Sequence, residues 1–412
     1  MKTNNTEMFE NWPIYKAVSS LIIPTVISQL IHVLYNMADT FFIGRVGDPS
    51  QVAAASLAMP LFMVCIGLAN LFGIGGSSLI ARSLGVGDKD RVRKTSAFAI
   101  WTGAFVALAY GTLAMLFKNY LLPFIGTNES TYAYTENYMF WTVGLGALPM
   151  VMNTLLAQIV RAEGYSKQAS VGIALGGILN IVLDPIFIHY MGKGVEGAAI
   201  ATMVSNTVAT LYFIFLFIKN RETLTITLNP KYYSAKEGIP KEVLLVGLPS
   251  AFLNILAIFS NINLNVLIAD YSNEAMAGFG IAKKIDSLIF AVSNGISQGV
   301  LPIIGYNYSA KNYPRMKEAI RATLVIILTF SFAALFFLYV FAPGMIRVFI
   351  DEADTVYYGQ LFQKRMCITA PFIAVTMMSL TLFQSVGKKV QPIILSLIRK
   401  GGIDIPLSQI KS

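Results

Sequence analysis

The chain has 412 residues, of which 55% are hydrophobic and only 13% charged, and it carries a formal net charge of +9. Average soluble domains contain about a quarter charged residues, so this composition excludes an ordinary soluble globule. The positive charge invites a nucleic-acid interpretation, which its distribution along the chain argues against.

Apolar runs of about 20 residues or more recur along the chain, and each is long enough to cross a hydrocarbon core of about 30 Å as a helix. Several of these runs are longer than needed, and Pro60, Pro149, Pro185 and Pro302 predict bends in them. The sequence therefore predicts an all-α polytopic membrane protein. The eleven predicted spans are 16–43, 52–84, 93–118, 131–162, 166–190, 195–219, 241–269, 275–305, 315–342, 356–386 and 390–407.

Lysine and arginine collect on one side of these spans. If the loops are numbered from a cytoplasmic N-terminus, the inside segments hold twenty basic residues, whereas the outside loops hold only Arg45, Lys118, Lys193 and Arg347. This asymmetry is the positive-inside rule, and it predicts a multi-pass protein of the bacterial cytoplasmic membrane with its N-terminus in the cytoplasm. The charge is thus a topology signal, and no nucleic-acid partner is expected. The polar first residues and the long apolar stretch after them do not fit a cleavable signal peptide.

Two stretches about 225 residues apart share one arrangement of apolar helix, glycine and basic loop. The first runs from Pro24 to Lys94, and the second runs from Pro249 to Lys317. A duplicated set of membrane-length helices is typical of secondary transporters, in which the substrate route lies between the two halves.

The longest polar interruption divides six spans from the remaining five. We therefore predict an N-terminal lobe at 1–220, a cytoplasmic linker at 221–240 and a C-terminal lobe at 241–412, related by a pseudo-two-fold axis along the membrane normal. The repeat offset places a partner for the sixth span beyond Ser412. The second lobe is thus expected to lack its last helix.

Ionisable residues at membrane depth cost at least about 2.5–3.5 kcal/mol on insertion scales, so each one needs a reason. In the first span His32, Asn36 and Asp39 share one helical face, and in the fifth span Asn180 and Asp184 are one turn apart. Two carboxylates flanked by amide and hydroxyl oxygens can bind a proton, or Na⁺, which like other hard cations prefers oxygen ligands. The predicted cation-coupling residues are Asn36, Asp39, Asn180, Asp184 and, in the sixth span, Thr202.

Simpler interpretations exist for each of these residues. Asp39 could be an acid at the membrane interface close to Arg45. Asp184 could lie at the outer end of its span, with its side chain reaching water. His32 could be a buried histidine whose hydrogen bonds are satisfied. The repeat offset places Asn263 opposite Asp39, so the second copy keeps polarity and loses the charge. Coupling by ion binding is therefore predicted in the first lobe.

Aromatic rings and flexible methionines suit a promiscuous pocket for cations, and amides tend to face the interior rather than lipid. Packing or lipid contact is the alternative for each such residue. The charged group Lys283, Lys284 and Asp286 fits either the outer interface or the central cavity. The predicted substrate-binding residues are Tyr35, Met63, Tyr138, Trp141, Met152, Asn153, Gln158, Asn294 and Gln298.

Nothing in the sequence supports catalysis or a cofactor. The chain has no HExxH motif and no Walker A loop, and Cys65 and Cys367 both lie in apolar spans. No metal site is predicted, apart from Na⁺ at Asp39 and Asp184. Without an ATP site, we expect the energy for transport to come from an ion gradient.

Several stretches resemble the multidrug and toxic compound extrusion (MATE) family, and among its members the bacterial exporters. They are 35–44 (YNMADTFFIG), 81–88 (ARSLGVGD), 161–164 (RAEG), 180–185 (NIVLDP), 297–299 (SQG), 305–308 (GYNY) and 383–385 (FQS). The resemblance runs from about residue 12 to residue 407. It implies a twelve-helix, two-lobe exporter that expels cationic and amphipathic drugs or dyes in exchange for H⁺ or Na⁺. It also implies an N-lobe cation site at Asp39, Asn180, Asp184 and Thr202.

The leading hypothesis is therefore an H⁺- or Na⁺-coupled antiporter, whose partners are membrane lipids and small hydrophobic cations. One alternative is a flippase for lipid-linked saccharides, which shares the broader architecture. The other is a membrane protein without transport activity, because its last helix is missing. The sequence leaves the coupling ion, the substrates and the oligomeric state open.

Overall fold

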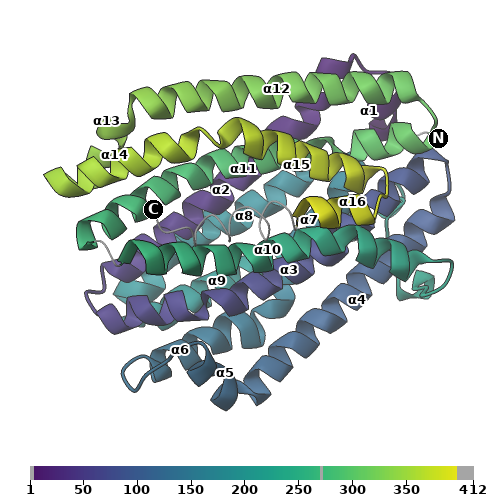
Figure 1. Ribbon diagram of the computed structural model, residues 1–412. Helices are drawn as coiled ribbons and strands as arrows, with labels where there is room; N and C mark the ends of the chain where they lie inside the picture. Colours follow the sequence, from purple (N-terminus) through teal and green to yellow (C-terminus); the bar gives the residue numbers. More distant parts are fainter. Residues whose placement is uncertain (1–3, 270–271, 397–412) are drawn as a thin grey trace.

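The computed structural model describes residues 4–269 and 272–396 (Figure 1), and it describes their side chains except at 4–6, 254–255, 257–267, 269 and 273. This part of the chain contains helices, turns and no strand, which confirms the all-α prediction. The helices run roughly side by side through the molecule.

Helices of the first half follow one another with short turns. Asp48 and Asp88 cap α3 and α4, since their carboxylates accept the backbone N–H groups of Ser50 and Arg91 at 2.9 Å each. The elements are α1 (Asn4–Glu10), α2 (Ile14–Gly44), α3 (Pro49–Gly85), α4 (Lys89–Leu116), α5 (Lys118–Phe124), α6 (Tyr132–Met139), the π-helical η1 (Phe140–Leu145), α7 (Ala147–Ala162), α8 (Ser166–Pro185), the π-helical η2 (Ile186–Tyr190) and α9 (Gly194–Lys219).

The second half follows after a linker that contains the 3₁₀ turn η3 (Pro230–Tyr232). Its elements are α10 (Ile239–Ala269), α11 (Asn273–Ser309), α12 (Tyr313–Val340), α13 (Ala342–Arg347), α14 (Ala353–Cys367), α15 (Ala370–Ser385) and α16 (Val390–Ser396). The predicted eleventh span, 390–407, is described only over α16, and its remainder lies outside the described residues.

Seven continuous helical segments of the described chain are long and apolar enough to cross a membrane, and two further pairs qualify as bent spans. One pair, Tyr132–Leu145 with Ala147–Ala162, bends by 47° next to Pro149, and Pro185 ends α8 where the chain changes to π-helix. Pro60 and Pro302 lie inside the unbroken α3 and α11. Of the four prolines, Pro149 and Pro185 thus mark breaks in the regular helix.

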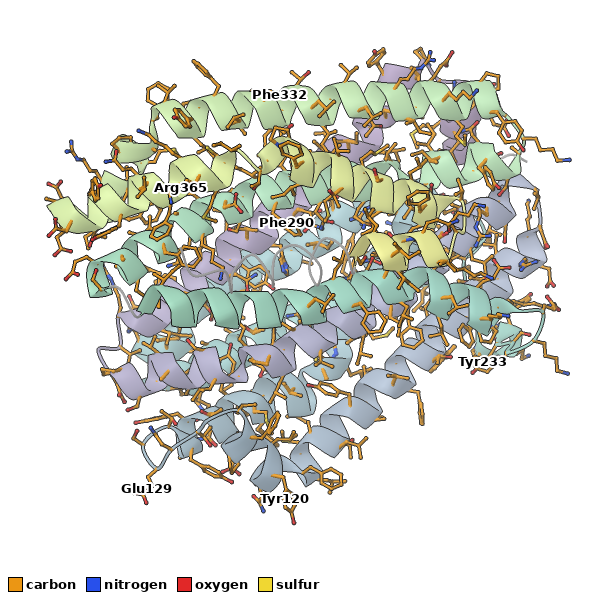
Figure 2. The ribbon with its side chains drawn as sticks, viewed as in Figure 1. Tyr120, Glu129, Tyr233, Phe290, Phe332 and Arg365 are labelled. Atoms are coloured by element: carbon orange, nitrogen blue, oxygen red, sulfur yellow. The ribbon has the colours of Figure 1, made fainter. Side chains whose placement is uncertain are left out.

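Large apolar side chains cover the outside of the helices. Figure 2 labels Phe332 on α12 and Tyr120 on α5, which are 57% and 78% exposed. Many other aromatic and aliphatic residues are exposed in the same way. A surface of this kind is expected where the solvent is lipid, and the fold is that of a multi-span membrane protein.

The two halves meet where α3 packs along α10 and where α2 packs along α11. We call this contact the seam. Gly75 and Gly247 permit it, because an added Cβ would lie 1.9 Å from the carbonyl oxygen of Val243 and 1.8 Å from that of Leu71. Only glycine allows two helix backbones to approach so closely. The division into lobes at 1–220 and 241–412 stays a prediction.

Ion pairs join the halves at one end of the seam, where α3 ends and α10 begins (right in Figure 1). We call it the basic end. The guanidinium of Arg82 lies 2.9 Å and that of Arg91 3.2 Å from the carboxylate of Glu242, and Lys94 lies 2.7 Å from Glu237. These groups are partly exposed, so each pair contributes about 0–1 kcal/mol.

Arg315 of α12 binds α1 at the same end. Its guanidinium donates to the backbone oxygens of Phe9, Met8 and Trp12 at 2.5, 3.1 and 2.7 Å. The hydrogen bonds and ion pairs described between the two halves therefore close the seam at the basic end.

The linker is tied to the first half by Glu163, which follows α7. Its carboxylate accepts the N–H groups of Thr225 and Ile226 at 2.6 and 3.2 Å. Burial raises the pKa of Glu163, and these hydrogen bonds counteract part of that effect. The indole of Trp101 adds a hydrogen bond of 3.0 Å to the carbonyl oxygen of Leu228.

Candidate functional site

The centre of the candidate site is Asp184 near the end of α8. It is fully buried, and one of its carboxylate oxygens accepts a hydrogen bond from the Asn180 amide at 3.2 Å. The second oxygen is enclosed and has no hydrogen-bond partner among the described residues. The same Asn180 amide nitrogen lies 3.4 Å from the hydroxyl of Thr202 on α9. The structure therefore brings together three of the predicted cation-coupling residues.

A chain of amides continues from Thr202 toward α7. Asn206 donates to the backbone oxygen of Thr202 at 2.8 Å, and its own side-chain oxygen accepts the Asn153 amide at 3.0 Å. All three side chains are buried, with at most 9% of their surface exposed. The sequence analysis did not single out Asn206, although its i, i+4 spacing from Thr202 in an apolar span was the available signal.

Asp39 approaches this group from α2. The helix can pack closely on α8 because Gly177 has no side chain, and an added Cβ would lie 2.6 Å from Ile31 and 3.3 Å from Tyr35. Asp39 and Asp184 are near enough to interact electrostatically. One oxygen of Asp39 is enclosed without a hydrogen-bond partner among the described residues.

Tyr35 and Tyr138 line the same region. Both tyrosines lie in the neighbourhood of Asp39 and Asp184, and Tyr138 is 8% exposed. Tyr35 also stacks edge-on against His32, with 4.9 Å between the ring centroids. Asn36 points back to its own helix, where its amide donates to the carbonyl oxygen of His32 at 2.7 Å.

The remaining predicted substrate residues are spread over three places. Trp141 lies in η1, where its indole donates to the carboxylate of Glu196 at 3.1 Å. Met152 belongs to the main buried apolar cluster, together with Phe72 and Leu155. Partly buried positions are occupied by Met63 on α3, Gln158 on α7, and Asn294 and Gln298 on α11. Trp141 packs against the same small apolar cluster that contains Tyr138, and the joint role of these residues in substrate binding stays a prediction.

The charged group on α11 lies early in that helix. The ammonium of Lys283 is 5.6 Å from the centroid of the Phe279 ring, one turn earlier, and Lys284 is exposed. Lys283 thus makes a cation–π contact within its own helix, which accounts for its position without a ligand.

The arrangement can bind one small cation or a proton. Two carboxylates with enclosed oxygens face an amide and a hydroxyl, and a buried unpaired carboxylate is strongly disfavoured unless it is neutralised. No group of three or more His, Cys, Asp or Glu side chains suited to a metal ion occurs in the described chain. Carboxylate, amide and hydroxyl oxygens are the ligands that hard cations prefer.

Membrane-length helices in two sets, with carboxylates and amides buried at membrane depth, define a polytopic membrane transporter. The family model MatE matches residues 24–186 and 249–410, and the chain therefore belongs to the MATE family of transporters. The family resemblance predicted from the sequence is confirmed. So is the prediction that the chain is not an enzyme.

Two relatives are multidrug export proteins MepA of staphylococci. The chain is 31% identical to that of Staphylococcus aureus strain MSSA476 over 364 residues, which cover 88% of this chain and 80% of the relative. It is 30% identical to that of Staphylococcus saprophyticus over 356 residues, which cover 86% of this chain and 78% of the relative.

Solved structures agree with this assignment. A multidrug resistance MATE transporter of the MOP superfamily in its outward-facing conformation has a TM-score of 0.91 and 26% identity, covering 97% of this chain and 88% of its own. A MOP superfamily transporter from Pyrococcus furiosus, described as having a binding pocket of reverse polarity, has a TM-score of 0.90 and 26% identity, covering 100% and 92%.

Proposed function

We propose that this protein is an antiporter that couples the entry of H⁺ or Na⁺ to the export of hydrophobic and cationic drugs or dyes across the bacterial cytoplasmic membrane. The observation that carries the proposal is that the buried Asp184 and the half-buried Asp39 each have an enclosed oxygen that lacks a partner among the described residues. An ion that neutralises these oxygens stabilises the ion-bound state. This binding free energy is what couples ion entry to drug export. Export of this kind confers resistance to the compounds that are carried.

The closed seam supports an outward-facing state. The positive-inside rule places the basic end in the cytoplasm, so the ion pairs of Glu242 and the close approach at Gly75 shut the cytoplasmic side. At the opposite end of α11, nothing lies within 4 Å of a Cβ added to Gly280. The likeness to an outward-facing MATE structure agrees with this assignment.

In this mechanism the ion enters from outside and binds between α2 and α8. Binding draws Asp39 toward Asp184 and Asn180, and α2 bends at Pro24, which lies inside the helix. The bend reduces the room for drug, which leaves outward. Opening of the seam toward the cytoplasm then releases the ion and admits the next drug molecule.

The test is ethidium efflux from energised cells that express the 412-residue chain. At equal expression, we expect Asp184→Asn and Asp39→Asn to lower efflux at least about tenfold. The neutral amide has no negative charge with which to bind and release H⁺ or Na⁺. Asp351→Asn is the matched control, since it alters an exposed carboxylate and should export like the parent. Parental efflux from both site variants would refute the proposal.

Purified protein in sealed vesicles then identifies the ion. A pH gradient and a Na⁺ gradient are imposed separately, and ethidium movement is followed in each. We expect one of the two gradients to drive transport in the parent and neither to do so in Asp184→Asn. Movement that is independent of both gradients would contradict antiport.

A further inference from the structure

A small cavity lies in the seam at the level of α7, and neither Asp39 nor Asp184 lines it. Its walls come from both halves, since α3 and α7 belong to the first and α11 to the second. Its volume of about 10 Å³ is the room needed by one occupant of about the size of a water molecule. The lining residues are Ser77, Gln158, Arg161, Gln298, Leu301 and Pro302.

Arg161 is the charged group of this cavity. The residue is 4% exposed, and its Nε and Nη2 atoms are enclosed without a hydrogen-bond partner among the described residues. No ion pair to Arg161 occurs in the described chain, although pairs are common at the nearby basic end. An unpaired buried cation costs several kcal/mol, so Arg161 needs a counter-charge.

Glu163, the carboxylate nearest to Arg161 in the sequence, is engaged elsewhere. Glu163 is used by the linker, whose Thr225 and Ile226 N–H groups it accepts. The C-terminal end of α7 lies beside Arg161 and supplies only a partial negative charge. No carboxylate of the described residues therefore neutralises the full charge of Arg161.

The other lining groups suit an anion. Leu301 and Pro302 are apolar, the Gln298 amide can donate, and no lining residue is acidic. Gln158 is the exception, because its side-chain oxygen has no partner, but that oxygen packs over Gly73, only 2.3 Å from where a Cβ would lie. A water molecule would accept hydrogen bonds from Arg161 but would leave its charge uncompensated. An anion would accept the hydrogen bonds and also compensate the charge.

We propose that Arg161 binds one small monovalent inorganic anion, such as chloride, in this cavity. Chloride is slightly larger than water, and a small adjustment of the flexible Gln298 side chain makes room for it. Sulfate and gluconate are too large to enter. Because both halves line the cavity, the anion stabilises the state in which the seam is closed.

The experiment measures thermal unfolding of the purified full chain in detergent, in potassium chloride and in potassium gluconate at equal ionic strength. We expect chloride to raise the unfolding midpoint of the parent saturably by about 1–2 °C, which corresponds to binding at roughly tenfold above its Kd for a protein of this size. Arg161→Gln should lose the rise. Lys167→Gln, which removes an exposed charge nearby, should keep it.

Equal midpoints in the two salts for the parent would overturn the proposal, as would a chloride effect that persists in Arg161→Gln. Since Arg161→Gln could fold poorly, the parent is also crystallised with bromide. A bromide peak in anomalous diffraction within hydrogen-bond distance of Arg161 is the expected result. Water density at that position without a bromide signal would overturn the anion site independently of any variant.

Discussion

The amide of Asn206 links the proposed ion site to α7, because it joins Thr202 to Asn153 through two hydrogen bonds of 2.8 and 3.0 Å. Asn206→Leu removes both bonds and leaves the buried Asn153 amide without its acceptor. An unsatisfied buried donor costs about 1–3 kcal/mol, so we expect a lower unfolding midpoint. Thermal unfolding of purified protein measures the effect.

Thr207→Val is the matched control for Asn206. Thr207 lies next to Asn206 on α9, and its hydroxyl bonds to Met203 of its own helix, at 2.8 Å from the backbone oxygen and 3.6 Å from the sulfur. We expect a change within about 0.5 kcal/mol for this variant. If both variants unfolded at the same temperature, the amide chain would have no structural role.

The sequence singled out Asp39 and Asp184 as candidates because charge at membrane depth is rare and therefore informative, and Asn180 because it lies one helical turn before Asp184. Asn206 carries no charge, and a single amide in an apolar span is a weak signal. Arg161 is one of the twenty basic residues of the inside segments, and only the structure shows that no described carboxylate pairs with it. Trp141 does have a charged partner in the structure, Glu196. The sequence could not pair them because they lie 55 residues apart along the chain.

Helix α10 is joined to α3 and to α4 by the ion pairs of Glu242 with Arg82 and with Arg91, respectively. Glu242→Gln removes both attractions at once. Each partly exposed pair contributes about 0–1 kcal/mol, so we expect the seam to open several times more often than in the parent, in the range of about 3–10-fold. The fold itself should be unaffected.

Labelling of a buried cysteine measures the opening at Glu242. Ser77→Cys places a thiol in the seam at a position that is 4% exposed, in a chain whose Cys65 and Cys367 are replaced by alanine. A water-soluble thiol reagent should react faster in Glu242→Gln than in the parent. Glu136→Gln breaks a pair with Lys118 inside the first half and should not change the rate. Equal rates in all three chains would show that the pairs of Glu242 do not hold the seam.

Helix-level features were predictable where proline or charge marks them. Pro149 correctly indicated the bend in the fourth span, whereas at Pro185 the fifth span stays continuous and changes from α-helix to π-helix. The 43° bend between α14 and α15 was not predicted, although Pro371 follows it directly. The π-helical segment η1 has no proline, and its geometry depends on packing against α4 and α9, which sequence periodicity does not report.

The molecule as a whole depends on a seam that must close tightly and open again. Gly247 is the tightest point, because an added Cβ would lie 1.8 Å from the carbonyl oxygen of Leu71. Gly247→Ala therefore forces α10 away from α3, and the relief has to come from the backbone, since no flexible side chain is involved. Each half is expected to keep its own packing. The variant should thus insert and fold while the closed seam is destabilised.

If export requires both states of the seam, Gly247→Ala should lower ethidium efflux at least about tenfold at equal expression, because the outward-facing state is rarely reached. Gly280→Ala is the matched control, as the same methyl group meets nothing within 4 Å at the other end of α11. Size-exclusion chromatography verifies that both variants are folded. Efflux at the parental rate from Gly247→Ala would mean that transport proceeds without the close contact of α3 and α10. The substrate route would then have to lie within one half rather than between the two.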